Sequence, residues 1–299
     1  MKHNEEGLAG VLVADIGGSH ITSAICCGQG NVDHNSVSRV EFSSKTSAQT
    51  ILESWCLAMH KSIAAFGGEV TGVGLAMPGP FDYENGICYL RGLNKYEAMY
   101  GMNIRQTLAG RLNIQAEKFR FRNDAEATIA GEVLYGTAVD SGSVLGITLG
   151  TGFGSAFFDG QTTRDINLGS EPFKETIADD YLSTRWFQRR SCELTGLSLT
   201  GGVRELASMA DSNLTAKAIF REFACNLTEF LGPYVTEYRP RSVLICGNIA
   251  KASKHFLTVI KKRLEVPLIM AGLGEHAALM GASGLFTATE GTIMQPSGH

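Results

Sequence analysis

The sequence has little proline and no excess of basic residues, and each shortage excludes a class of protein. Only 7 of its 299 residues are proline, and no proline-rich linker is present. Lys and Arg number 26 against 30 Asp and Glu, so the net charge of −4 argues against nucleic-acid binding. No apolar run approaches the ~20 residues of a membrane-spanning helix, and no secretion signal follows the polar N-terminus. We therefore expect neither a nucleic-acid nor a membrane partner.

The cysteines also lack any pattern that would suggest a metal site. There are 7, an odd number, and they form neither a CxxC motif nor a Cys/His cluster with zinc spacing. Most lie in apolar stretches, where a free cysteine behaves as a small hydrophobic residue. This pattern indicates a reducing, cytoplasmic compartment.

Glycine is abundant, with 35 residues, and two glycine-rich turns divide similar pairs of predicted strands. The first turn contains Gly17 and Gly18, between apolar segments at residues 8–14 and 20–26. The second covers residues 150–154, between apolar segments at residues 144–149 and 155–158. Because the same strand–turn–strand unit occurs twice, the sequence predicts two related halves.

The remaining elements alternate between helix and strand, which predicts α/β layering. Thr46 and Gln49 have the spacing of a capping box, which predicts the start of a helix. A long apolar stripe from Ile219 to Tyr238 predicts a helix that ends before Pro240. The expected elements after it are a strand at 242–246, a helix at about 250–264, a strand at 267–271 and a helix at about 276–286.

The two glycine turns are candidate phosphate-binding sites. Backbone N–H groups in such turns can surround an anion, and Asp15 at the end of the first strand can hold Mg²⁺ beside it. The alternative is an ordinary hairpin turn. No GxxxxGK[ST] string is present, which excludes a P-loop, and the GxGxG spacing at 150–154 does not match the dinucleotide fingerprint.

The order of these motifs resembles the ROK family of repressors and sugar kinases, within the actin-like and hexokinase-like ATPase superfamily. The resemblance extends from about Val11 to Phe286. Five motifs occur in family order: residues 14–19 (ADIGGS), 74–80 (GLAMPGP), 122–127 (RNDAEA), 149–154 (LGTGFG) and 244–250 (LICGNIA).

The resemblance implies a two-lobed α/β fold of the actin-like ATPase (ribonuclease H-like) type, with a duplicated core and an interlobe cleft that binds ATP and a sugar. We expect residues 1–122 to form an N-terminal lobe and residues 123–286 a larger C-terminal lobe. A final helix at about 287–299 would pack back on the first lobe. The expected cofactor-binding residues are Asp15, Gly17, Gly18, Ser19, Gly150, Thr151, Gly152, Gly154, Gly247 and Asn248, with Asp15 as the Mg²⁺ ligand.

Asp124 is the expected catalytic residue. It matches the family's aspartate, which would take the proton of the sugar hydroxyl as that oxygen attacks the terminal phosphate. Without the resemblance, a residue at the start of a predicted helix would be read as an ordinary N-cap. The two roles are compatible, because a capping residue can also face a substrate.

Four further residues are expected at the sugar, where Asp124 also lies. Asn123 matches the family's sugar-binding asparagine, and Glu171 resembles its hydroxyl-binding glutamate. Gly79 and Asn94 lie in segments that approach the sugar in relatives, although a strand-ending turn and a solvated loop are the alternatives.

The chain departs from the family pattern after Glu171. Many relatives place a glycine and a histidine there, followed by a zinc-binding cysteine cluster, whereas this chain has Lys174 at the histidine position. Only Cys192 lies nearby. We therefore expect no structural zinc and a sugar pocket that lacks the histidine contact.

The sequence as a whole predicts ATP-dependent phosphorylation of a hexose or amino-hexose, in the manner of a glucokinase. The alternative is a non-catalytic sugar-binding sensor. Only ten residues precede Val11, too few for the helix-turn-helix domain of family repressors. A kinase that uses polyphosphate is a weaker third hypothesis. Since relatives are commonly dimers, we expect a homodimer.

Overall fold

The computed structural model describes residues 8–196 and 198–287, which fold into two compact units. The first unit contains residues 8–135 and 275–287, and the second contains residues 136–196 and 198–274. No described helix is both long enough and apolar enough to cross a membrane.

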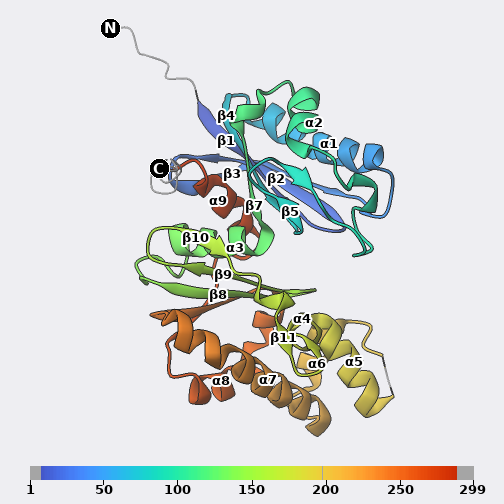
Figure 1. Cartoon of the computed structure of the whole chain (residues 1–299), viewed down its shortest axis with the longest axis vertical. Helices are drawn as coiled ribbons and strands as arrows, with labels where there is room; N and C mark the ends of the chain where they lie inside the picture. Colours follow the sequence, from blue (N-terminus) through green and yellow to red (C-terminus); the bar gives the residue numbers. More distant parts are fainter. Residues whose placement is uncertain (1–7, 197, 288–299) are drawn as a thin grey trace, which may run out of the picture. The chain divides into compact units, whose positions relative to one another are not determined.

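The first unit is built on a five-stranded sheet with strand order β3-β2-β1-β4-β7 (Figure 1). Strands β1, β2 and β3 are antiparallel neighbours, whereas β4 and β7 run parallel to β1. Its elements are β1 (Ala9–Ile16), β2 (His20–Cys27), β3 (Asn31–Glu41), α1 (Ala48–Phe66), β4 (Glu69–Met77), β5 (Phe81–Asp82), β6 (Ile87–Cys88), α2 (Ile104–Leu112), β7 (Phe119–Asn123), α3 (Asp124–Tyr135) and α9 (Ala277–Gly284).

The alternating side chains of β1 explain how helices cover both faces of this sheet. Leu12 and Ile16 belong to the core that includes Trp55 of α1, whereas Val13 packs with Leu279 of α9. Successive side chains of a strand point to opposite faces. Asp15 therefore shares the face of Val13, the face that α9 covers.

The second unit repeats this architecture with strand order β10-β9-β8-β13-β14. Strands β8, β9 and β10 are antiparallel neighbours, and β13 and β14 run parallel to β8. Its elements are β8 (Val144–Leu149), β9 (Phe153–Phe158), β10 (Thr163–Asp165), η4 (Leu168–Ser170), β11 (Pro172–Phe173), β12 (Thr176–Ile177), α4 (Asp179–Leu182), α5 (Thr184–Thr195), α6 (Gly202–Met209), α7 (Leu214–Tyr238), β13 (Ser242–Cys246), η5 (Asn248–His255), α8 (Leu257–Arg263) and β14 (Leu268–Met270). The predicted duplication of the core is confirmed.

Aromatic packing around the long helix α7 dominates the second core. Phe223 lies 4.7 Å from Phe187 of α5 between ring centroids, and Phe230 lies 5.7 Å from Phe153 of β9. All four rings are buried. This packing connects α7 to the strand that follows the second glycine turn.

Two predicted boundaries differ from the structure, and a third lies outside the described residues. The chain divides after Tyr135 rather than after Arg122, because α3 packs on α9 within the first unit. The helix expected at about 287–299 lies outside the described residues from position 288 onward, and α9 is the element that returns to the first unit. The segment expected as one helix at 250–264 is the 3₁₀ helix η5 followed by α8.

The predicted capping box is wrong by one residue. Ser47 is the N-cap of α1, and its Oγ accepts a hydrogen bond from the N–H of Thr50 at 3.2 Å. The hydroxyl of Thr46 instead donates to the carbonyl of Ser43 at 2.8 Å. The helix therefore begins one residue later than its sequence pattern predicts.

Candidate active site

Two of the predicted site residues, Asp15 and Asp124, lie at the same edge of the first sheet. Asp15 pairs with Ala76 of β4, and Asn123, the last residue of β7, pairs with Met77. Because β1, β4 and β7 are parallel, their carboxyl ends meet at one edge, where ligands bind in open α/β sheets. Asp124 follows directly as the first residue of α3.

The two carboxylates interact electrostatically. Burial, followed by the charge of Asp124, raises the pKa of Asp15 to about 7, while Arg39 opposes the rise. Burial is also the main cause that raises the pKa of Asp124, and the N–H of Ala125 and the charge of Lys95 oppose it. Two partly buried carboxylates in one site favour a bound cation.

Asn123, rather than Asp124, caps helix α3. Its Oδ1 accepts hydrogen bonds from the N–H groups of Ala125 at 2.8 Å and Glu126 at 3.2 Å. Asp124 Oδ1 accepts the N–H of Ala125 at 2.8 Å. The N-cap alternative for Asp124 is therefore wrong, since the preceding residue fills that role.

Gly79 lies beside Asn123. A Cβ atom added at Gly79 would lie 3.3 Å from the hydroxyl of Tyr83 and 3.8 Å from Nδ2 of Asn123. That amide donates to the Tyr83 hydroxyl at 3.2 Å, and the hydroxyl donates to the Met77 carbonyl at 3.1 Å. Tyr83 thus holds the amide of Asn123, a role that no sequence signal indicated.

Asn94 lies in an exposed loop of the first unit, in the left-handed conformation with φ 56°. Its N–H donates to Glu97 Oε1 at 3.1 Å. The described structure includes no hydrogen bond between Asn94 and Asn123 or Asp124. Its neighbour Lys95, which the sequence analysis passed over, is the residue of this loop whose charge acts on Asp124.

The first glycine turn is held by its carbonyl groups. Those of Gly18 and Ser19 accept the N–H groups of Ser44 at 3.2 Å and Phe42 at 2.9 Å, and the Gly17 carbonyl accepts the hydroxyl of buried Tyr96. Among the described residues, the N–H groups of Gly18 and Ser19 donate to no protein acceptor. Backbone N–H groups without a protein acceptor are able to donate to an anion.

The second glycine turn has a similar design within its own unit. The Gly150 carbonyl accepts both the N–H and the hydroxyl of Thr184 at the start of α5, at 2.8 and 2.9 Å. The N–H of Gly150 donates to the Gly152 carbonyl at 3.0 Å. Thr151 and Gly152 are exposed, and within the described structure their N–H groups donate to no protein acceptor. Gly154 follows in β9, paired with Thr148.

An ion pair beside the second turn was missed by the sequence analysis. Asp179 Oδ1 accepts the N–H of Phe153 at 2.5 Å, and its other oxygen binds the guanidinium of Arg185. A Cβ atom at Gly152 would lie 3.1 Å from that carboxylate. Glycine at position 152 therefore leaves room for Asp179 to fix the turn.

Gly247 lies against the strand that leads into the second turn. It has φ 91°, and an added Cβ atom would lie 2.3 Å from the Leu149 carbonyl oxygen. Only glycine fits this close approach and this backbone conformation. The exposed Asn248 follows it at the start of η5, so the structure brings these two residues beside the Gly150 turn.

Glu171 precedes the short hairpin of β11 and β12, and Lys174 lies in the turn between these two strands. Glu171 is exposed, and its carbonyl accepts the N–H of Ala178 at 2.9 Å. Lys174 Nζ donates to Asn226 Oδ1 of α7 at 2.5 Å and lies 5.2 Å from the Phe173 ring centroid. Lysine at this position therefore attaches the hairpin to α7.

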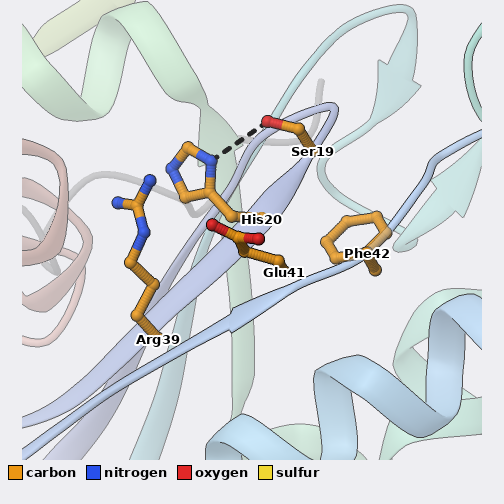
Figure 2. Close-up of a pocket in the computed structure, with 5 residues that line it drawn as sticks. All are labelled: Ser19, His20, Arg39, Glu41 and Phe42. Atoms are coloured by element: carbon orange, nitrogen blue, oxygen red, sulfur yellow. Dashed lines mark hydrogen bonds between the residues drawn. The ribbon is translucent and has the colours of Figure 1, made fainter.

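A cavity of about 480 Å³ lies beside the first glycine turn (Figure 2). Its lining residues are Ser19, His20, Arg39, Glu41 and Phe42. Of these, the sequence analysis selected only Ser19. No group of three or more His, Cys, Asp or Glu side chains within residues 8–196 and 198–287 is arranged to hold a metal ion.

Comparisons with known proteins agree with this fold. A glucokinase of the ROK family from Streptomyces griseus, solved with glucose and AMPPNP, is 20% identical. The match covers 92% of this chain and 98% of that one, with a TM-score of 0.75. An inorganic polyphosphate/ATP-glucomannokinase from Arthrobacter is 25% identical over 92% and 97% of the two chains, with a TM-score of 0.70.

A ROK family transcriptional regulator, a homologue of the E. coli MLC protein, also shares the fold. It is 14% identical, the match covers 92% of this chain and 77% of the regulator, and the TM-score is 0.78. A sequence comparison with curated proteins gives no match.

Two sheets of one topology, each with a glycine turn after its first strand, define the class of this protein as the actin-like ATPase fold, with its duplicated core. The model of the ROK family matches residues 11–165, more than half of the chain. The chain belongs to the ROK family. Its solved structural relatives include sugar kinases as well as the regulator.

Proposed function

We propose that this protein is an ATP-dependent kinase that phosphorylates a hydroxyl group of a hexose or amino-hexose. The observation that carries the proposal is the pair of Asp15 and Asp124 at the carboxyl ends of parallel strands, where the charge of Asp124 raises the pKa of Asp15. Family membership and the sugar kinases among the structural relatives support it.

Asp124 acts as the general base. Phosphoryl transfer depends mainly on positioning and charge stabilisation, and one carboxylate orients the attacking hydroxyl and accepts its proton. Burial raises the pKa of Asp124, which makes the carboxylate a stronger base than an exposed one. Because Asn123 caps the helix, Asp124 is available to the substrate.

The sugar contacts are assigned to five residues. Asn123 offers an amide whose orientation Tyr83 holds, and Gly79 lets the substrate approach that amide. Asn94 and Glu171 are the remaining candidates, together with Asp124 itself.

The donor is ATP, and each unit offers candidate phosphate-binding groups in its own glycine turn. The N–H groups of Gly18, Ser19, Thr151 and Gly152 have the donor chemistry that phosphate oxygens require. Further contacts are assigned to the turn residues Gly17, Gly150 and Gly154, and the adenosine to Gly247 and Asn248.

Asp15 fits a Mg²⁺ ion, because burial and then the charge of Asp124 raise its pKa to about 7, and a bound cation would favour the ionised carboxylate. A Mg²⁺ ion bound there with ATP would neutralise part of the phosphate charge. We propose that the protein contains no structural zinc, works in the cytoplasm and forms a homodimer. Elemental analysis and light scattering test the first and last of these statements.

The test is a coupled assay of ADP release against a panel of glucose, N-acetylmannosamine, allose, fructose and β-glucosides. We expect turnover with at least one sugar and ATP, and its loss in Asp124→Asn. A second series with polyphosphate tests the other donor class. Absence of turnover with every sugar and donor would overturn the proposal.

The alternative is a sugar-binding sensor without kinase activity, favoured by the regulator among the structural relatives. Calorimetric titration with the same sugars separates the two functions. A sugar that binds tightly but is not phosphorylated identifies the sensor.

A further inference from the structure

Three residues on neighbouring strands form a row across the first sheet. Asp15 of β1 lies opposite Thr22 of β2, and Thr22 lies opposite Arg39 of β3. Residues directly opposite each other in antiparallel strands project from the same face. Arg39 and Asp15 therefore share a face, separated only by the short side chain of Thr22.

The same face carries the polar lining of the cavity beside the first glycine turn. His20 lies two residues before Thr22 and opposite Glu41, which lies two residues after Arg39. Figure 2 shows the side chains of His20, Arg39 and Glu41 on one side of the two strands, with the Ser19 hydroxyl 3.3 Å from His20 Nδ1. The cavity thus combines a guanidinium, an imidazole, a hydroxyl and a carboxylate.

Arg39 differs from Arg111 and Arg122 of the first unit in the interactions of its guanidinium group. Arg122 forms an ion pair with Glu126 at 3.4 Å, and Arg111 binds Gln49 at 2.6 Å. The guanidinium of Arg39 makes no hydrogen bond or ion pair within the described structure. Its charge nevertheless opposes the rise in the pKa of Asp15 and, after burial, contributes to the lowered pKa of His20, so it acts on both residues.

We propose that Arg39 binds the terminal phosphoryl group of the donor, in the cavity beside the Gly17–Ser19 turn. The inference rests on the proposed kinase function and adds a residue to it. A guanidinium presents planar, paired donors that match phosphate oxygens, and such contacts are stronger than neutral hydrogen bonds.

The alignment of Asp15, Thr22 and Arg39 on neighbouring strands indicates which phosphoryl group Arg39 would bind. Arg39 and Asp15 share one face of the sheet, and Asp15 lies at the same sheet edge as Asp124, the proposed base. The phosphate nearest the base is the one that is transferred. Among the described residues no ion pair joins Glu41 to Arg39, and Glu41 lies opposite His20 across the strands.

The contact would matter most during the transfer. Negative charge spreads over the oxygens of the transferred group, and a fixed cation beside them stabilises the transition state more than the ground state. Arg39→Met should therefore lower kcat as well as donor affinity.

Isothermal titration of the full-length protein with Mg²⁺ and AMPPNP, and separately with ADP, tests the inference. We expect Arg39→Met to weaken AMPPNP binding about 10- to 100-fold and to leave ADP binding nearly unchanged. Arg39→Lys, which keeps the charge and loses the paired donors, should be intermediate. The matched control is Arg221→Met, a substitution of an exposed arginine of α7.

Each outcome decides the inference. Equal AMPPNP affinity in wild type and Arg39→Met overturns it, as does an equal loss of AMPPNP and ADP affinity, because the contact would then not be at the terminal phosphate. Binding of AMPPNP that depends on Arg39, without turnover of any sugar, upholds the phosphate site and refutes the kinase proposal. A wild-type protein that binds neither AMPPNP nor inorganic tripolyphosphate refutes both.

Discussion

Asn123 and Asp124 are neighbours in the chain, yet they have separate roles at the start of helix α3. Asn123 accepts the N–H of Glu126 at 3.2 Å as the helix cap, whereas Asp124 accepts the adjacent N–H of Ala125 at 2.8 Å. The helix therefore does not depend on the Asp124 carboxylate for its cap. Changes at the two positions should have different consequences.

Substitution Asp124→Asn should abolish most catalysis without unfolding the protein. Removal of a general base typically costs about 10²–10⁴-fold in rate. Steady-state kinetics on the best sugar should show the fall in kcat, while Tm and sugar affinity remain near those of wild type. The matched change Asn123→Ala should lower stability by about 1 kcal/mol, because it removes the cap. An unchanged kcat in Asp124→Asn would refute the role as base.

The stability of the free protein should depend on pH because of the carboxyl group of Asp15. Its pKa is raised from 3.8 to about 7, first by burial and then by Asp124. The protonated form therefore stabilises the folded state, and this contribution is lost as the pH rises through about 7. Asp15→Asn, which stays neutral, should gain Tm relative to wild type at pH 8 and not at pH 4, without Mg²⁺.

Asp159 provides a control, because its contribution to stability should change with pH in the opposite direction. Hydrogen bonds from Thr162 and Gln161 lower its pKa, so its stabilising effect is present above pH 4 and is lost as the pH falls. Asp159→Asn should therefore lower Tm at pH 8 and have less effect near pH 3. A Tm difference between Asp15→Asn and wild type that does not vary with pH would contradict the raised pKa.

Substitution by alanine at two helix glycines of the first unit should change the stability of the protein in opposite directions. A Cβ atom at Gly281 of α9 would lie 1.7 Å from the Ala127 carbonyl oxygen of α3, so the helices would have to separate. We expect Gly281→Ala to destabilise the protein by about 1–3 kcal/mol. Gly110 of α2 has open space around it, and Gly110→Ala should stabilise by about 0.5–1 kcal/mol. Urea unfolding of both variants measures the difference, and a stabilised Gly281→Ala would refute the close packing.

The Lys174 attachment should contribute to stability, unlike an exposed ion pair. Lys174→Met removes the donor to Asn226, a residue that is only 2% exposed, and should cost about 1–3 kcal/mol. Lys254→Met breaks the exposed pair with Asp211 and should cost at most about 1 kcal/mol. Denaturant unfolding compares the two variants. Equal losses would indicate that Lys174 is an ordinary surface lysine.

Much of the fold could be predicted because its signals are local. The apolar run before Asp15, and the glycines that follow it, require only the preferences of a few adjacent residues. The same holds for the strand at 144–149 and for the long helix that ends before Pro240, which the structure places at Leu214–Tyr238. Repetition of one local pattern was sufficient to predict the duplicated core.

Features that depend on pairing between distant segments could not be predicted in this way. Arg39 has no local signal and gains its place beside Asp15 only through the register of β2 and β3. The division after Tyr135 depends on the return of α9, and the position of Lys174 depends on Asn226 of α7. The sequence by itself determined the strand ends and glycine turns, because those are set by neighbouring residues. The tertiary structure decided which charges meet there, since register and helix packing are settled only when the whole core is buried.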